Sequence, residues 1–300
     1  MTVFSKMLKR NTKLFFKDKG LFFTSLITPM ILLVLYVSFL GNVYSDSLLS
    51  ALPEGFTLSD KILKGFTGAQ LISSILSVSC VTVAFCSNML MVQDKANGQM
   101  KDIAVSPAKS HTLALSYYFG ALISTLTVCF AATAVCLVYI AFVGWYLSFA
   151  DVVLLITDVL IMTMFGTSLS SIVNFFLSSQ GQISAVGTIV SSGYGFISGA
   201  YMPLSQFSEG LQKVVSLLPG TFGTVLFRNH AMRGVLSAME DDGLPKEFIS
   251  ELRDVFDCNL YVFDKAVGTG GLYAVILGTV AALIGIYVLL NYFKLKSAKK

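Results

Sequence analysis

Charged side chains are scarce in this sequence. Asp, Glu, Lys and Arg make up 13% of the 300 residues, and hydrophobic residues make up 55%. An ordinary soluble domain carries about 25% charged residues. This composition excludes the soluble classes and indicates an integral membrane protein, with the lipid bilayer as one of its partners.

Residues and motifs that carry enzyme chemistry are also scarce. The two histidines, His111 and His230, are expected on opposite sides of the membrane, so they cannot share a metal. The five cysteines form neither a disulfide framework nor a CxxC metal pair. The segment GTSLS at 166–170 lacks the final glycine of a nucleophile elbow, and a phosphate-binding GxxxxGK[ST] loop is absent. The sequence thus predicts no catalytic residue, no metal and no cofactor bound by this chain, so any ATP-driven role needs a partner.

Long apolar segments predict the fold. A helix needs about 20 apolar residues to cross the hydrocarbon core. Six segments reach that length: 21–41, 69–92, 112–143, 152–177, 183–202 and 272–293. We therefore predict an all-α integral membrane protein with six transmembrane helices in a single domain over residues 1–300.

The distribution of Lys and Arg predicts the orientation. These residues gather in the N-terminal segment 1–20, in the loop between the second and third spans, and after residue 293. With six spans, all three regions fall on one face, which the positive-inside rule makes cytoplasmic, both termini included. The net charge of +4 reflects this bias, and no basic patch points to nucleic acid.

The N-terminal segment 1–20 has the pattern of an amphipathic helix. Phe4, Met7, Leu8 and Phe15 recur at helical spacing, while basic residues occupy the other faces. Such a helix suits the membrane interface, with its apolar side in the acyl boundary. A simple positively charged anchor is the alternative, but the spacing favours the interface helix.

The fifth predicted span carries small residues at every fourth position, namely Gly187, Ser191, Gly195 and Gly199, with Tyr194 beside them. Such a stripe lets another helix backbone approach closely. These residues are candidates for a transport pathway or a dimer interface. Ordinary packing inside the subunit explains the stripe at least as well.

Proline and glycine interrupt the apolar stretch after the fifth span. No unbroken helix of spanning length fits between Pro203 and Pro219, and Glu209 lies between them. We predict a re-entrant pair of short helices over 203–227, since irregular backbone at membrane depth must be buried in protein or line a wet cavity. An external loop over 228–267 would follow, with an amphipathic helix that starts at Pro245.

One carboxylate, Asp158, falls inside a predicted span, and Asp151 precedes it by seven residues on the same helical face. Ionisable groups within a membrane are functional candidates, because burying them is costly. Asp158 therefore predicts either a proton or cation relay, or a contact to substrate. A carboxylate that is hydrogen-bonded to a neighbouring helix is the structural alternative, and both remain open.

The stretch QDKANGQMKDIAVSPAKS separates the second and third spans. Ala96, Met100 and Ile103 can share one face of a short helix over 94–107, which Pro107 would end. A short helix held between two spans would transmit force to both, which is what a docking site for a soluble motor requires.

This stretch resembles the coupling segment of the type-2 ATP-binding-cassette exporter permeases. The similarity rests on the acidic-basic pair Asp94 and Lys95, on Gly98, on Met100 and Ile103 where the pattern has leucines, and on Ser106 with Pro107. Ala96, Gln99 and Lys101 depart from the pattern. The N-terminal amphipathic helix, the six spans and the SGAYMPLSQFSEGLQKVVSLLPG stretch also resemble this family, so the similarity covers essentially the whole chain.

The resemblance implies a permease in a bacterial cytoplasmic membrane that dimerises with a like or unlike permease. Two copies of a cytoplasmic ATPase would bind it, with ATP and Mg on those chains. The implied substrates of such an exporter are drugs, antibiotics, lipids or lipid-linked glycans, and the aromatic residues near the small-residue stripe favour an amphipathic small molecule or a lipid. A secondary transporter driven by an ion gradient and a non-transporting membrane assembly are the rival classes.

Overall fold

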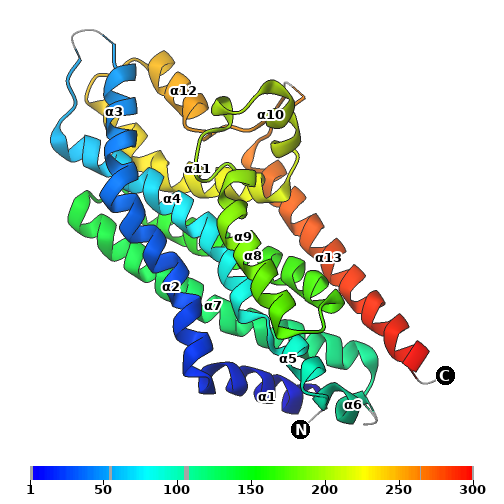
Figure 1. Cartoon of the computed structure of the whole chain (residues 1–300). Coiled ribbons are helices and arrows are strands. Elements are labelled where there is room, and N and C mark those ends of the chain that lie inside the picture. Colours follow the sequence, from blue (N-terminus) through cyan, green and yellow to red (C-terminus); the bar gives the residue numbers. More distant parts are fainter. Residues whose placement is uncertain (1–2, 54–55, 105–107, 264, 299–300) are drawn as a thin grey trace.

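The computed structural model of the protein describes residues 3–53, 56–104, 108–263 and 265–298. Its elements are almost all helices, arranged as a bundle with both chain termini toward the same end (Figure 1). A two-stranded antiparallel hairpin, β1 (Tyr261–Val262) and β2 (Lys265–Ala266), pairs Tyr261 with Ala266 and Val262 with Lys265.

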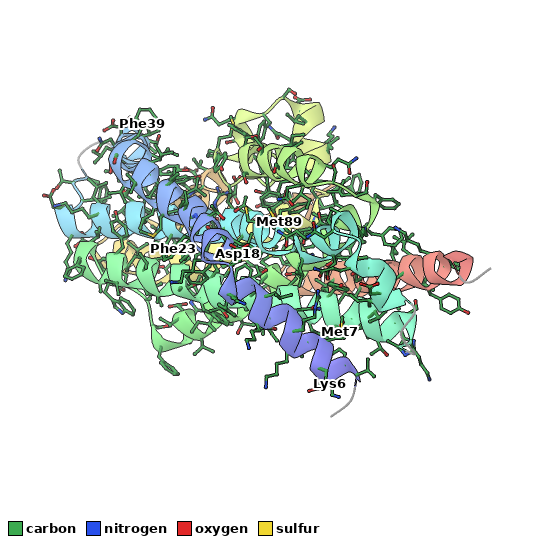
Figure 2. All side chains as sticks on the ribbon, turned by 60° about the horizontal axis from the view of Figure 1, so that its bottom comes forward. Lys6, Met7, Asp18, Phe23, Phe39 and Met89 are labelled. Atoms are coloured by element: carbon green, nitrogen blue, oxygen red, sulfur yellow. The ribbon has the colours of Figure 1, made fainter. Side chains whose placement is uncertain are left out.

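The chain begins with a helix that runs across the base of the bundle. Helix α1 (Val3–Lys17) meets α2 (Lys19–Leu35) at Asp18, whose carboxylate accepts the Leu21 N–H and so caps α2 (Figure 2). Helix α2 then continues without a break through the π-helical turn η1 (Tyr36–Leu40) into α3 (Gly41–Ala51). The N-terminal helix is therefore present, while its place at a membrane interface stays a prediction.

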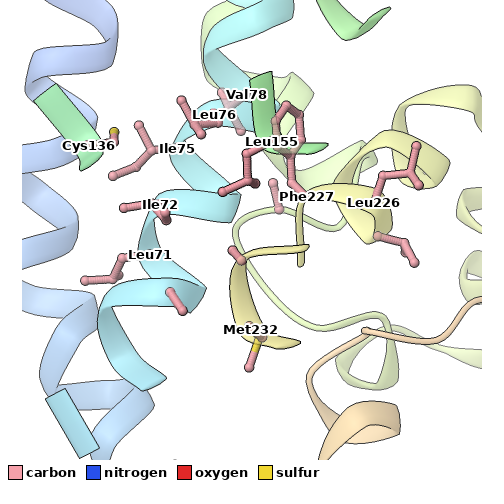
Figure 3. Packing of buried hydrophobic residues seen from close by; sticks show 14 of the residues in the cluster. Leu71, Ile72, Ile75, Leu76, Val78, Cys136, Leu155, Leu226, Phe227 and Met232 are labelled. Carbon is pink, nitrogen blue, oxygen red and sulfur yellow. The ribbon is translucent and has the colours of Figure 1, made fainter. Parts of the chain in front are cut away.

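Helix α4 (Asp60–Ser87) is the centre of the bundle. It packs against α2, α7 (Ser110–Val143), α8 (Phe149–Phe176), α9 (Gln180–Ile197) and α11 (Pro219–Asp241). Figure 3 shows Leu71, Ile72, Ile75 and Leu76 of α4 at the core of this packing, with Phe227 of α11 beside them. These side chains are buried on all sides, so α4 is shielded from the surroundings by its neighbours.

Small residues allow the closest approaches within the bundle. A Cβ atom added to Gly166 of α8 would lie 2.7 Å from the Cys80 carbonyl oxygen and 2.9 Å from the Val81 Cα atom of α4. Only glycine permits this separation of the two backbones, as is common where membrane helices pack.

The end of the bundle away from the termini is built from shorter elements. The 3₁₀ turn η2 (Leu204–Gln206), α10 (Glu209–Val215) and α12 (Lys246–Val255) lie there, and the last helix α13 (Thr269–Ala298) starts there and runs back toward the terminal end (Figure 1). Between α4 and α7 lie α5 (Leu90–Ala96) and α6 (Gln99–Ala104), at the terminal end.

Five helical stretches of the described chain are long and apolar enough to cross a membrane. They are Lys19–Ala51, Asp60–Ala96, Ser110–Val143, Phe149–Phe176 and Thr269–Lys294. The remaining predicted span, the fifth at 183–202, corresponds to α9, which does not meet this criterion because glutamine, glycine and serine dilute its apolar residues. Helix α9 ends at Ile197, since Gly199 adopts a φ of +68° and turns the chain. The all-helical membrane class agrees with the prediction, and the count of six spans stays a prediction.

The expected boundary between a re-entrant pair and an external loop is wrong. Only η2 and α10 are short, whereas α11 begins at Pro219 and continues to Asp241, through the first part of the predicted loop 228–267. Pro219 suits the first position of a helix. Beyond it, Arg228 and His230 looked like loop residues in sequence, but both are buried and paired within the fold. The amphipathic helix expected after Pro245 is present as α12.

Candidate functional site

The stretch between α4 and α7 forms two short helices, so the single helix expected over 94–107 is wrong. Helix α5 ends at Ala96 and α6 begins at Gln99. The break occurs because Gly98 has a φ of +78°, a left-handed conformation that glycine adopts without strain. Ser106 and Pro107 lie outside the described residues.

Asp94 of α5 faces inward and joins three elements. Its carboxylate accepts two hydrogen bonds from the Arg10 guanidinium of α1, at 2.8 and 2.9 Å, and one from the Tyr117 hydroxyl of α7, at 2.5 Å. Arg10 also donates to the Gln99 side chain of α6 at 2.9 Å. The hydrogen bond to Asp94 raises the pKa of Arg10 above its ordinary value.

Lys95 of α5 also faces inward, toward the end of α8. Its ammonium group donates to the carbonyl oxygens of Asn174, Phe175 and Leu177, at 3.0, 2.8 and 3.0 Å. The last carbonyls of a helix have no partner within the helix, and a cation there also complements the helix dipole. Lys95 thus fixes α5 to the C-terminal end of α8.

The predicted coupling residues therefore divide into two groups. Asp94 and Lys95 hold α5 against α1, α7 and α8, so their charges serve contacts inside the chain. Helix α6 presents Gln99 and Asp102 to the surroundings, while Met100 packs partly against a cluster that includes Met91. A docking role for this segment stays a prediction.

A cavity of about 320 Å³ lies beside this segment, between α1, α5 and α7. Polar side chains from several elements line it, among them Asn11, Asn88, Gln93, Asn97 and Gln99. Leu14, Phe15 and Leu21 form the apolar part of the wall. The cavity is amphipathic, and it opens next to the corner where α1 meets α2.

Asp158 of α8 has partners on two other helices. One carboxylate oxygen lies 2.5 Å from Nδ1 of His230 on α11, and the other accepts the Tyr273 hydroxyl of α13 at 2.6 Å. Asp151, seven residues earlier, pairs with Arg233 of α11 at 2.5 Å. Asp158 thus joins α8 to α11 and α13. This is the hydrogen-bonded arrangement that the sequence analysis gave as the structural alternative. A role in proton or cation transfer stays a prediction.

Sequence reasoning missed His230, Tyr273 and Arg233 as partners of these carboxylates. One signal was available: His230 and Arg233 are three residues apart, so they share one face of α11, as Asp151 and Asp158 share one face of α8. This spacing is informative only once residues 219–241 are known to form a helix.

The small-residue stripe of α9 makes few close contacts within the chain. Nothing lies within 4 Å of a Cβ atom placed on Gly187, and Ser191 is half-buried. Gly195 instead accommodates the Tyr201 ring, and Tyr194 is buried against Gly220 of α11. The stripe is therefore not covered by other residues of the chain at Gly187 and is only partly covered at Ser191. Its role in a pathway or dimer interface stays a prediction.

The segment predicted to be re-entrant is anchored by a buried ion pair. Arg228, 1% exposed, donates to Asp257 at 2.8 Å and to the Gly199 carbonyl oxygen at 2.7 Å. Burial raises the pKa of Asp257, while Arg228 and the Leu204 N–H oppose that rise. Pro203 precedes η2, exposed Glu209 begins α10 and Pro219 begins α11. Whether this segment enters the membrane stays a prediction.

The fold and this segment define the class of protein. A helical bundle with several apolar helices of spanning length is a multi-pass membrane protein. Among the residues that the structure describes, no three His, Cys, Asp or Glu side chains come together so as to hold a metal ion.

Comparison with known families then identifies the family. The family described as ABC-2 family transporter protein matches residues 55–293, and the chain belongs to it. It is a transporter membrane subunit of the ATP-binding-cassette class, and catalysis is not a property of this family's chains. No curated protein matches the sequence.

Proposed function

We propose that this chain is the permease subunit of an ATP-driven exporter that moves an amphipathic small molecule, such as a drug or antibiotic, or a lipid out of the cytoplasm or inner leaflet. Two copies of a cytoplasmic ATPase supply the energy and carry the ATP and Mg. The termini, α1, α5 and α6 face the cytoplasm of a bacterial cell. Family membership and the positive-inside bias support this assignment.

The contacts of α5 are the observation that carries the proposal. Through Asp94 and Lys95, this helix is joined by hydrogen bonds to α1, α7 and α8, and only the Asn97–Gly98 turn separates it from α6. A displacement of α6 by a docked ATPase is therefore transmitted to three helices at once. This arrangement suits the conversion of ATPase closure into helix movement.

A second permease would cover the apolar side of α2 and η1. Phe23, Ile27, Ile31, Val34 and Phe39 are exposed along this side in the isolated chain. A large apolar surface of this kind needs either lipid or another apolar surface over it. In the proposed exporter, part of it meets the partner permease.

The test uses the exposed charge on α6. We would co-express the chain with its candidate ATPase, reconstitute the complex in lipid nanodiscs and liposomes, and measure ATP hydrolysis and export for Asp102→Lys. The matched control is Asp60→Lys, which reverses an exposed carboxylate at the other end of the bundle. We expect export driven by ATP to fall about tenfold or more in the first variant only, since like charges that face each other at an interface cost several kcal/mol.

A further variant, Met100→Glu, places a charge on the half-buried side of α6. It should separate hydrolysis from export while the permease elutes as a folded species. Normal coupled turnover in both α6 variants would overturn the assignment of α6 as the coupling element.

A secondary transporter is the second candidate, and the contact between Asp158 and His230 is the observation that favours it. Buried ionisable pairs between membrane helices mark proton and ion routes in such transporters. Export in liposomes with ATP depleted and a proton gradient maintained separates the two candidates. Transport that survives ATP depletion would overturn the ATP-driven reading and make Asp158 the next residue to change.

A further inference from the structure

A cavity of about 310 Å³ lies at the end of the bundle away from the chain termini, between α8, α11, α12 and α13. Its wall is strongly polar. Six side chains supply it with hydrogen-bonding groups: Asn229, His230, Arg233, Arg253, Thr269 and Tyr273. No Asp or Glu belongs to the described lining, and Arg233 and Arg253 supply its cationic donors.

Each arginine side chain in the wall contacts a second side chain that holds its guanidinium group. Asp151 forms an ion pair with the half-exposed Arg233 side chain at 2.5 Å, and the Ser148 N–H donates to Asp151 at 2.9 Å. The Asn229 side-chain oxygen accepts from Arg253 at 2.8 Å. These contacts use one terminal nitrogen of each guanidinium, and a guanidinium has five N–H donors, so donors remain for a ligand.

His230 is positioned in the same way. Its Nδ1 atom lies 2.5 Å from Asp158, and its ring stacks on Tyr273 with the centroids 6.3 Å apart and an angle of 22° between the planes. Because Nδ1 faces the Asp158 carboxylate, Nε2 is the ring nitrogen left for a ligand, and it donates to an anion when the ring is an imidazolium. Side chains whose rotamers are fixed by a second set of contacts are what a preorganised site requires.

The start of α13 adds to the positive character of this cavity. Helix α13 begins at Thr269, which lines the cavity, and runs for 30 residues. The first N–H groups of a helix lack partners within it and carry the positive end of the helix dipole. Two guanidinium groups, an imidazole and a helix N-terminus thus converge on one space.

We propose that this cavity binds an oxyanion of the phosphate type. Phosphate oxygens match the paired donors of arginine, and they are also favoured at a helix N-terminus. A bound cation is disfavoured, because the carboxylates Asp151 and Asp158 already face Arg233 and His230. The phosphate is carried either by a lipid headgroup or by a free ion, since both present the same oxygens. This site is separate from the α5–α6 segment and does not depend on ATP.

The experiment uses the full-length chain in nanodiscs, without ATPase or nucleotide. In the first arm, inorganic phosphate is titrated into nanodiscs of a glycosyl diacylglycerol, a lipid without phosphate, at constant ionic strength, with chloride as the reference, and binding is read by calorimetry and thermal unfolding. In the second arm, retention of phosphatidylglycerol against the same phosphate-free glycosyl diacylglycerol is measured by native mass spectrometry. A failure of either arm leaves the proposed exporter function intact, because neither arm involves transport.

Three variants make the result specific to the cavity. Arg253→Gln removes a guanidinium whose described partner is neutral, and Asp151→Asn/Arg233→Gln removes an ion pair together, so that no buried carboxylate loses its partner. The control is Lys246→Gln, an exposed cation on the same helix as Arg253 that pairs with Glu240 at 3.0 Å outside the cavity.

We expect both cavity variants to bind the probe about tenfold or more weakly, since hydrogen bonds to charged groups are lost, and the control to bind like the parent chain. Phosphate binding in the first arm assigns the free ion as the source, and selective retention in the second arm assigns the headgroup. Absence of binding in both arms, or equal loss in the Lys246→Gln chain, would overturn the proposal.

Discussion

Replacement of Arg10 by Gln tests whether α1 is fastened to the coupling segment by a partly buried ion pair. The two partners differ in exposure: the Asp94 side chain is 4% exposed and the Arg10 side chain is 30% exposed. An exposed pair contributes about 0–1 kcal/mol, but a buried carboxylate that loses its partner costs about 3–5 kcal/mol. Because Tyr117 still donates to Asp94, we expect the lower end of that range, about 3 kcal/mol.

Hydrogen exchange of the α1 amides measures this loss directly. If α1 opens locally, about 3 kcal/mol corresponds to exchange that is roughly 100-fold faster or more. Lys9→Gln is the matched control, because it removes the same charge from an exposed position of the same helix. If Arg10→Gln and Lys9→Gln accelerate exchange equally, α1 is held by general attraction to the membrane surface and the ion-pair argument is refuted.

Two further predictions concern packing and helix ends. In Gly166→Ala, the new methyl group meets the Cys80 carbonyl, so thermal unfolding should show a free energy of unfolding lower by about 1–3 kcal/mol. The control Gly187→Ala has open space around it and should keep or raise the melting temperature. Equal effects of the two substitutions would contradict the close approach of α4 and α8. In Lys95→Met, the Asn174 and Phe175 carbonyls of α8 and the Leu177 carbonyl just after it lose their donor. Hydrogen exchange in the last turn of α8 should therefore accelerate by about tenfold or more, with exposed Lys109→Met unchanged.

Much of the helical organisation could be predicted from the sequence. The apolar runs at 112–143, 152–177 and 272–293 lie within a few residues of α7, α8 and α13, because a membrane helix has to be apolar along its whole length. The amphipathic pattern of α1 and of α12 was equally informative, since one face of each helix packs on the bundle. These features depend on local sequence, so no knowledge of the neighbours was needed.

Helix boundaries were predicted less well wherever glycine or proline had two possible roles. Gly98 broke the expected coupling helix in two, and Gly199 ended α9 before residue 202. Pro219 looked like an interruption, but it begins a 23-residue helix. The same residue types start helices, stop them or allow close packing, and the choice depends on the surroundings.

The sequence by itself determined the membrane class, the long helices and the place of the short polar segment between α4 and α7, since these follow from composition and period. The tertiary structure alone decided which charges meet. Asp94 pairs with Arg10, which is 84 residues away, and Asp158 pairs with His230, which is 72 residues away. A buried charge needs a partner, but the sequence does not say which helix supplies it. That choice depends on which helix faces come together around α4, and the packing of the whole bundle determines those faces.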